Sequence, residues 1–444
     1  MITYDHYKQV NAGWIAEIPF HWEATAVKFV CTFNDEVLPE TFDPEALIDY
    51  VEISDVDESR GLKSSELMPY KAAPSRARRI VRDGDVIIST VRTYLRAVAP
   101  ITSPPENLVV STGFAVIRPE RLTSGFARYA LVAEGFVGSV IARSTGVSYP
   151  AINANDLVRI PVPVPPLDEQ IAIAAYLDAE TKRIDELIEQ KKLLLAALTE
   201  LRQSAIDDAI SLGINSAVEM KEAGIPWLEK IPKHWNVVQL RHVLDELAKN
   251  GIFKKSDDFG EGTLLVNVSD LFSESFEIDP ERLQRVRCTE EEIEKYRVQC
   301  GDLFLVRSSL KLEGIARFAI AQKVYEPTVF ECHVVRLRPD LNLVDPDFLV
   351  KFLNSSIAKA SLISRAKTTT MTTIDQGEIL ATKVILPPID EQRVLVEEIN
   401  DRTKRVDEIV VHTKQEISLL VALRSATITD AVLGRIDVRK TQTH

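Results

Sequence analysis

The sequence is poor in several features that mark particular classes of protein. Its 444 residues include only four cysteines, and no two of them have the CxxC spacing: Cys31, Cys288, Cys300 and Cys332. This argues against a zinc site or a disulfide framework and favours a reducing compartment, the cytoplasm. No apolar run reaches about 18 residues, so no membrane-spanning helix is expected. The start, MITYDHYKQV, lacks the basic and apolar regions of a signal peptide.

Motifs of catalysis are missing as well. The chain contains no GxxxxGK[ST], no HExxH and no GxSxG, which argues against a P-loop nucleotide site, a zinc protease and an α/β-hydrolase. A self-sufficient methyltransferase would need a cofactor site and an NPP[YF]-type motif, and the sequence has neither. We therefore expect no metal and no cofactor.

The net charge is −13, which taken alone argues against nucleic acid as a partner. The charge is unevenly distributed, however. Residues 1–50 carry two lysines against nine acids, whereas residues 60–100 carry nine lysines and arginines against three acids. Residues 301–386 carry eleven basic residues against nine acids. A basic island therefore lies in the first half of an acidic chain, and the second half has only a faint one.

The chain spells an unusual pentapeptide twice, as IPFHW at 18–22 and as IPKHW at 231–235. Other blocks recur in the same order: YVEISDV (50–56) with LVNVSDL (265–271), DGDVIIS (83–89) with CGDLFLV (300–306), AVIRPE (115–120) with VRLRPD (335–340), PPLDEQ (165–170) with PPIDEQ (387–392), and TKRIDELI (181–188) with TKRVDEIV (403–410). The sequence is thus a tandem duplication of about 220 residues, too long a period for a solenoid. Each copy should fold around its own core.

Each copy changes character at its double proline. Before it, short alternating runs punctuated by Gly and Pro predict strands, and 126–142 and 346–363 predict helices. After it, Leu167–Leu212 and Ile389–Leu433 contain neither Gly nor Pro, which predicts a helix of roughly 68 Å in each copy. Pro166 and Pro388 suit the first helical position, and Gly213 and Gly434 are placed to end the helices.

A helix this long cannot bury an apolar stripe on a small domain alone, so two matching stripes predict that the helices pack on each other. The predicted interface consists of Ile184, Leu187, Leu198, Leu201, Val406, Ile409, Leu420 and Leu423. The predicted fold is α+β: two pseudo-twofold-related mixed α/β domains separated by an antiparallel pair of long helices. The predicted boundaries are 1–164, 165–213 and 214–386, then 387–434 for the second helix and 435–444 for a tail.

Basic and hydroxyl side chains gather in a few stretches of each half. Arginine suits bidentate recognition of guanine and phosphate contact, and short hydroxyl side chains in loops contact phosphates and base edges. The candidate DNA-binding residues of the first half are Arg76, Arg78, Arg79, Arg92, Tyr94, Arg96, Arg143, Ser144, Thr145 and Tyr149. Those of the second half are Lys254, Lys255, Arg307, Ser308, Lys311, Arg365, Lys367, Thr368, Thr369 and Thr370. Each stretch could equally be a solvated loop, but their recurrence at matching places favours DNA.

Two other patterns invite a catalytic interpretation. The pairs His21–Trp22 and His234–Trp235 could be catalytic histidines, but a turn at Pro followed by a Trp anchor explains them better. The acids of the two DEQ tripeptides stand in the first helical turn, where negative charge complements the helix dipole. We therefore interpret both patterns as structural.

Several stretches together resemble the specificity (S) subunit of type I restriction-modification systems: GWIAEIPFHWE, GIPWLEKIPKHWN, IPVPVPPLDEQIAIAAYL, VILPPIDEQRVLVEEI and ITDAVLGRIDVR. The resemblance covers essentially the whole chain. It implies two target recognition domains, two conserved helical regions and no catalysis by the subunit itself. It further implies double-stranded DNA and two modification (methyltransferase) subunits as partners, with restriction (endonuclease/translocase) subunits as an optional addition and no membrane. A protein scaffold that bridges partners without DNA is the remaining alternative.

Overall fold

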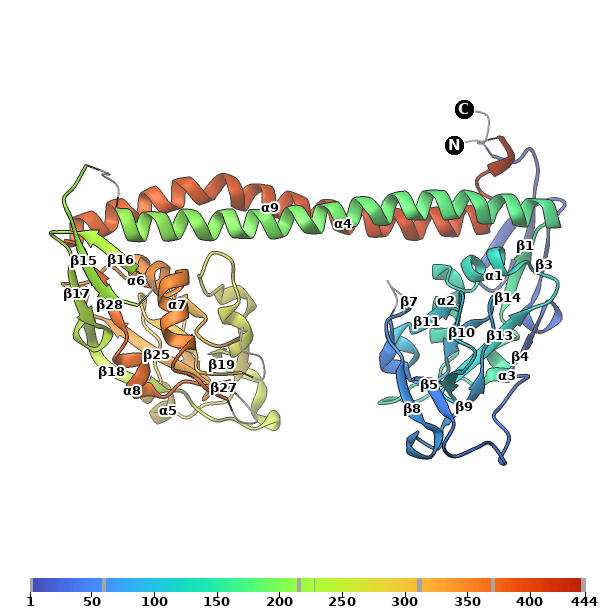
Figure 1. Ribbon diagram of the computed structural model, residues 1–444, viewed down its shortest axis with the longest axis horizontal. Coiled ribbons are helices and arrows are strands. Elements are labelled where there is room, and N and C mark those ends of the chain that lie inside the picture. Colours follow the sequence, from blue (N-terminus) through green and yellow to red (C-terminus); the bar gives the residue numbers. More distant parts are fainter. Residues whose placement is uncertain are drawn as a thin grey trace. The chain divides into compact units, whose positions relative to one another are not determined.

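The computed structural model describes residues 3–57, 61–213, 217–226, 228–309, 314–368 and 372–440. The chain divides into two compact units, one formed by Met1–Lys192 with Gln415–His444 and one formed by Leu193–Lys414. Each unit contains one globular domain and one end of each long helix (Figure 1). The predicted segments 1–164 and 214–386 therefore each share a core with residues of both long helices.

The first unit is built on two four-stranded sheets. One is antiparallel, in the order β11-β10-β13-β4: Val98–Pro100, Val86–Ser89, Phe114–Pro119 and Cys31–Phe33. The other has the order β8-β5-β12-β9: Glu66–Pro69, Leu47–Val51, Leu108–Ser111 and Ala77–Ile80. In this second sheet β5 and β12 run parallel, and β9 stands at the edge. Ile87 and Phe114 of the first sheet share a core with Val51 and Val110 of the second. A two-stranded pair, β6 (Val56–Asp57) and β7 (Gly61–Leu62), completes this region.

The stretch 126–142, predicted as one helix, forms two: α1 (Ser124–Ala130) and α2 (Glu134–Ala142), followed later by α3 (Ala154–Leu157). In Figure 1 α1 and α2 lie between β10 and β13 and the start of the first long helix, and Phe126, Phe136 and Leu177 share one core. No single helix among the described residues is long and apolar enough to cross a membrane. Only α1 and α2 together, bent by 57°, reach that length and composition.

The second unit repeats the first sheet, in the order β18-β25-β21-β23: Leu244–Asn250, Val334–Pro339, Leu303–Val306 and Phe318–Ile320. Its second sheet has only three strands, β20-β19-β24: Gln284–Val286, Phe259–Val266 and Thr328–Phe330. Parallel β19 and β24 correspond to β5 and β12. In the part of this unit that the structure describes, no strand takes the place of β9.

Further elements of the second unit are α5 (Glu290–Lys295), α6 (Pro346–Leu353), α7 (Ser356–Ile363) and α8 (Gln376–Leu380). The predicted helix 346–363 is therefore also broken in two. The break falls at Asn354 and Ser355, where the Ser355 hydroxyl accepts a hydrogen bond from the Ala358 N–H and so caps α7.

Two short ribbons open and close each domain. In the first unit β1 pairs with β2 and β3 with β14: Tyr7–Ala12, Ile15–Pro19, Glu23–Ala26 and Pro161–Val164. In the second unit β15 pairs with β16 and β17 with β28: Met220–Ile225, Leu228–Pro232, Asn236–Gln239 and Lys383–Leu386. Both opening ribbons have the same register, with Tyr7 opposite Pro19 and Met220 opposite Pro232. The duplication in the sequence is therefore a duplication of strand pairing.

The long helices are α4 (Leu167–Leu212) and α9 (Ile389–Val432), close to their predicted bounds. Both are followed by glycine with positive φ, +69° at Gly213 and +68° at Gly434, as expected for a C-terminal cap. Pro166 occupies the N-cap of α4, one residue before the predicted first helical position. Its carbonyl accepts the first helical hydrogen bond, from the Gln170 N–H.

Within each unit the two helices run antiparallel, and an arginine pairs with an aspartate across them. In the first unit Arg424 Nε lies 2.9 Å from Asp185 Oδ1, and in the second Arg202 Nε lies 2.7 Å from Asp407 Oδ1. The arginines are 222 positions apart in the sequence, and so are the aspartates. The two ion pairs are thus equivalent members of the duplication.

The predicted helix-pair interface is only partly correct. Ile184, Leu198 and Val406 are buried and Leu420 is half-buried, but four of the eight predicted residues are exposed: Leu187, Leu201, Ile409 and Leu423. Two packed helices bury a stripe with alternating steps of three and four residues. The predicted set included a third apolar column beside that stripe. It also missed polar members of the stripe, such as Thr181 and Thr413, which are buried.

Candidate nucleic-acid interface

The IPxHW pentapeptide joins the ends of the two long helices in each unit. Trp22 is fully buried, and an added Cβ on Gly434 at the end of α9 would lie 2.9 Å from its ring and 2.5 Å from Pro19. In the second unit the partner is Gly213 at the end of α4, whose added Cβ would lie 3.2 Å from the Trp235 ring. Glycine is therefore required twice, by its positive φ and by this close approach.

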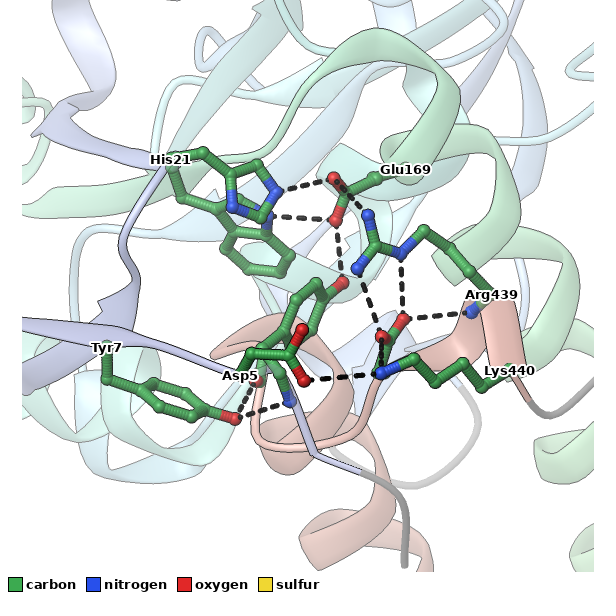
Figure 2. A network of polar contacts seen from close by, with 10 residues as sticks. Asp5, Tyr7, His21, Glu169, Arg439 and Lys440 are labelled. Atoms are coloured by element: carbon green, nitrogen blue, oxygen red, sulfur yellow. Dashed lines mark hydrogen bonds and ion pairs between the residues drawn. The ribbon is translucent and has the colours of Figure 1, made fainter.

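We call the contact between the pentapeptide and the ends of the two long helices the joint. At the start of α4, Glu169 belongs to the joint of the first unit, and its side chain is 3% exposed (Figure 2). Its carboxylate accepts hydrogen bonds from the Tyr4 hydroxyl at 2.6 Å and from Trp22 Nε1 at 3.0 Å, and His21 Nε2 lies at 2.6 Å. Arg439 approaches to 3.5 Å. Burial raises the pKa of Glu169, but these hydrogen bonds outweigh it and leave the pKa lowered. The donors of the chain itself enclose the carboxylate, as expected for a structural joint.

The second unit has a simpler version of this joint. His234 Nε2 lies 2.8 Å from Glu391, whose side chain is 27% exposed. Trp235 is fully buried, and among the described residues no hydrogen-bond partner meets its Nε1. The third residue of each DEQ tripeptide acts alike in both units. The side-chain oxygen of Gln170 accepts from Thr123 N–H, and that of Gln392 from Asp345 N–H. Each glutamine thus anchors the residue that caps α1 or α6.

A buried arginine–aspartate pair explains two further sequence repeats, DGD/CGD and IRPE/LRPD. Arg118 on β13 donates two hydrogen bonds to Asp85, at 2.9 and 2.8 Å. Arg338 on β25 donates two to Asp302, at 2.7 and 2.9 Å. Both aspartates are 1% exposed. These pairs fix the strands β10 and β21, whose C-terminal ends lead directly into the candidate loops.

In the first unit the loop after β10 is fastened to the loop after α2. Val91 and Thr145 each form a β-bridge with Ala151. The Thr93 hydroxyl donates to the Ser144 hydroxyl at 2.7 Å, and Ile152 N–H donates to the Thr90 carbonyl at 2.9 Å. The predicted residues 92–96 and 143–149, separated by about fifty positions in the sequence, are therefore brought together.

We call residues 90–96 and 143–151 the loop cluster of the first unit. Its side chains differ in exposure and in their contacts. Arg92 has a left-handed backbone, with φ +51°, and its guanidinium lies 4.9 Å from the centre of the exposed Tyr149 ring. Arg96 also has positive φ, at +53°, but it forms an ion pair with Glu134. Tyr94 is 52% exposed. The exposed Arg143 follows the end of α2.

Arg76, which directly precedes β9, and the two arginines of β9 have structural contacts that the sequence did not predict. Arg76 donates to Glu52 at 2.5 Å and to Tyr50 at 3.2 Å. Arg78 donates to the Leu38 carbonyl at 2.9 Å. Arg79 is half-buried, and this burial lowers the pKa of its guanidinium. Backbone hydrogen bonds connect this strand to the loop cluster, because Thr112 N–H donates to Arg76 O and Thr90 N–H donates to the next carbonyl, of Gly113.

The second unit has a matching cluster with different side chains. Ser308 and Lys367 both stand opposite Thr373, as Val91 and Thr145 stand opposite Ala151. The predicted loop 365–373 instead contains two short strands, β26 (Lys367–Thr368) and β27 (Thr372–Thr373), which join β22 (Ser308–Ser309) in a small sheet. Ser308 Oγ hydrogen-bonds His333 Nδ1 at 2.9 Å, and Lys367 pairs with Asp375 at 2.8 Å.

The remaining predicted residues of this unit have varied surroundings. Arg365 lies 3.8 Å from Glu378, and Arg307 N–H donates to the His333 carbonyl. Lys254 pairs with Glu292 at 2.7 Å, and Lys255 begins a short 3-10 turn. Three predicted residues lie outside the described residues: Lys311, Thr369 and Thr370.

One group of potential metal ligands in the second unit has no CxxC spacing. Glu331, Cys332 and His333 lie beside this cluster with donor atoms within 4.8 Å of one another, a set that Zn²⁺ accepts. One Glu331 oxygen accepts the His333 backbone N–H, and His333 Nδ1 is bonded to Ser308. These bonds give the group a structural role in the turn between β24 and β25.

Known proteins place this architecture in a family. The sequence model described as "Type I restriction modification DNA specificity domain" matches residues 70–196 and 232–419, well over half of the chain. The EcoKI specificity subunit of Escherichia coli K12 is 23% identical over 72% of this chain and 68% of its own length. The MjaVIII specificity subunit of Methanocaldococcus jannaschii is 22% identical over 67% of both chains.

The fold has a relative among solved structures. A chain from a structure addressing complex assembly and conformational transition of the type I R-M system superposes with a TM-score of 0.68. The two chains are 22% identical, and the match covers 94% of this chain and 99% of the other. Two recognition domains with a repeated sheet and two long helices are thus a known arrangement. The chain belongs to the type I restriction-modification DNA specificity family, whose named relatives are specificity subunits of type I restriction enzymes.

Proposed function

We propose that the chain is the DNA-reading subunit of a type I restriction-modification complex and that it binds an asymmetric, two-part duplex site. The observation that carries this proposal is the repeated loop cluster. In each unit the strand held by a buried arginine–aspartate pair ends in a loop that is fastened to the segment after the second helix. The skeleton is the same and the side chains differ, as expected for two readers of different half-sites.

An exchange of one domain tests this function. Residues 214–386 are replaced by the matching segment of a relative that methylates a different site, while both long helices are kept. In complex with the methyltransferase subunits, the hybrid should methylate a site with this protein's first half and the relative's second half. Exchanging 1–164 is the matched control and should change the other half. A folded hybrid that methylates only a parental site would refute separate readers.

We also propose that the helices dock two methyltransferase subunits, which supply the positive charge that this acidic chain lacks. On α4, Leu187, Leu194 and Leu201 follow one another at steps of seven residues and are 36%, 39% and 56% exposed. On α9, Ile409 and Leu423 are 40% and 47% exposed. Such a column beside an already filled helix seam suits the packing of a further helix.

The docking proposal predicts that Leu194→Glu with Leu201→Glu abolishes co-purification with the methyltransferase subunits. The control is Ala196→Glu, which adds charge to an exposed position on the opposite side of α4. Circular dichroism should show folded protein in both cases. Undiminished complex formation by the double variant would place the docking surface elsewhere. The chain alone should bind DNA weakly, because its net charge is −13.

The lengths of the helices are proposed to set the number of unread bases between the half-sites. One heptad is inserted in α4 after Lys192 and one in α9 after Lys414, where the two units divide. Seven residues add about 10 Å of helix and preserve the seam. About three base pairs at 3.4 Å should be added to the spacer, with both half-sites unchanged. An active variant with an unchanged spacer would contradict this.

A further inference from the structure

We propose that Arg92, held against Tyr149, reads a guanine in the first half-site. The inference rests on the proposed function and goes beyond it, because it assigns one base type to one residue. Ten residues of this unit were candidates from the sequence, and the structure distinguishes Arg92 from the other arginines by its surroundings.

The first distinguishing feature is a guanidinium that combines a free edge with a contact to an aromatic ring. Arg76 is paired with Glu52, Arg96 with Glu134, and Arg78 donates to a carbonyl. Arg79 is half-buried, with its Nε inaccessible, and among the described residues no aromatic ring lies against the exposed Arg143. Among the described residues no hydrogen bond or ion pair reaches the Arg92 guanidinium, and its contact is the Tyr149 ring at 4.9 Å. A guanidinium that stacks on an aromatic face keeps its in-plane N–H groups available for other acceptors.

The second feature is a backbone set before any ligand binds. Arg92 has φ +51°, an uncommon conformation for a residue with a side chain. The neighbouring residues hold it there, because Ser89 Oγ donates to Val91 O at 2.6 Å and Thr93 Oγ1 to Ser144 at 2.7 Å. Strained conformations that the surroundings enforce concentrate at functional sites. Arg92 is therefore aimed by the fold, whereas a phosphate contact needs no such fixed direction.

The donors of the guanidinium determine which base it can recognise. Arginine has five donors and no acceptor, so it needs two adjacent acceptors to form a bidentate pair. In the major groove only guanine offers two, N7 and O6, whereas adenine presents a donor at N6. The exposed side chains beside Arg92, Tyr94 at 52% and Val147 fully exposed, provide apolar contacts to the neighbouring bases.

The second unit lacks this device at the equivalent place. Because Val91 and Ser308 occupy matching positions opposite Ala151 and Thr373, Arg92 corresponds to Ser309. The guanine contact is therefore specific to the first half-site and contributes to the asymmetry of the whole site.

Genome-wide mapping of methylation by the complete methyltransferase complex tests the inference. In Arg92→Ala, the preference for guanine at one position of the first half-site should fall by roughly 5- to 150-fold, the range for one bidentate pair. Arg92→Lys should relax the same position, because it keeps the charge but loses the fork. Tyr149→Phe should leave specificity unchanged and Tyr149→Ala should relax it. Arg159→Lys is the control, because this exposed arginine of the same unit is not among the candidate DNA-binding residues and pairs with Asp156.

Three results would overturn the inference. One is a first half-site without guanine, and another is an Arg92→Ala variant that keeps full guanine preference. The third is an Arg92→Ala variant that weakens all sequences equally and lowers the salt slope by about one, which would identify a phosphate contact. An unchanged second half-site in every variant reports a folded complex. Failure of the proposed function would look different, since the wild-type complex would then methylate no two-part site.

Discussion

The two recognition units share a skeleton and differ in what they place on it. The antiparallel sheet, the arginine–aspartate pair, the glutamine anchor and the helix-ending glycine recur in both units. The first unit adds the arginine-bearing edge strand β9, and the described part of the second unit has no counterpart. The repeated residues are thus those that position the loops, and the differing residues are those that the loops present.

The joints between helix and domain differ as well. Glu169 gathers Tyr4, His21, Trp22 and Arg439, whereas Glu391 has His234. The first joint has three extra donors: Tyr4 and Arg439, which lie near the two ends of the sequence, and Trp22, whose counterpart Trp235 does not reach Glu391. Residues near both termini therefore contact Glu169 in the first unit, whereas His234 of the internal pentapeptide contacts Glu391 in the second. The following predictions test how far the shared parts are equivalent and how much the differences matter.

The largest effect is expected from the shared arginine–aspartate pair. Asp85→Ala and Asp302→Ala should each lower the free energy of unfolding of their unit by about 3–5 kcal/mol, because each change removes two hydrogen bonds from an arginine and one from a backbone N–H. The arginines keep their ion pairs with Glu36 and Glu246. Urea denaturation of each variant measures the loss. Similar losses are expected, since both aspartates are 1% exposed. A large loss in one unit and none in the other would show that the skeletons are not energetically equivalent.

The next effect should separate the two joints. Gly434→Ala should cost about 2–4 kcal/mol, from positive φ and from a Cβ forced against Pro19 and Trp22. Gly213→Ala has the same φ but a looser contact, 3.2 Å to Trp235, and should cost about 1–2 kcal/mol. Thermal unfolding compares the pair. Equal losses would mean that the backbone conformation alone, and not the contact with tryptophan, sets the requirement for glycine.

The buried carboxylate predicts a difference in pH dependence. Since the pKa of Glu169 is lower in the folded chain than in the unfolded one, its stabilisation is present above the ordinary value of about 4.3 and is lost as pH falls through the folded pKa. Glu169→Gln should cost about 2 kcal/mol at neutral pH, and the gap from wild type should narrow below about pH 4. Glu391→Gln should cost less than about 1 kcal/mol. A gap that stays constant in acid would exclude this role of the charge.

The sequence predicted the repeated order of elements and the helices α4 and α9. These follow from local patterns: absence of Gly and Pro, a terminal glycine and matching blocks. It did not predict which helix residues are buried, because Leu187 and Leu201 fit an apolar stripe as well as Ile184 does. It also could not distinguish Arg92 from Arg78, since that depends on Tyr149 and on the Leu38 carbonyl, both distant in sequence.

The smallest effect is expected from the charges of the edge strand, where the two units differ most. Arg79→Gln should lower the slope of log affinity against log salt by about one when the methyltransferase complex binds its site, because among the described residues no carboxylate pairs with this β9 arginine and its phosphate contact is lost. Lys367→Gln in the second unit should have a smaller effect, since Asp375 pairs with this lysine at 2.8 Å. Arg82→Gln is the control on the first unit, because Glu36 engages Arg82 at 2.8 Å. Fluorescence anisotropy over a series of salt concentrations gives the three slopes. Equal slopes in all three variants and the wild type would mean that β9 faces solvent in the complex and that the basic island takes no part in binding.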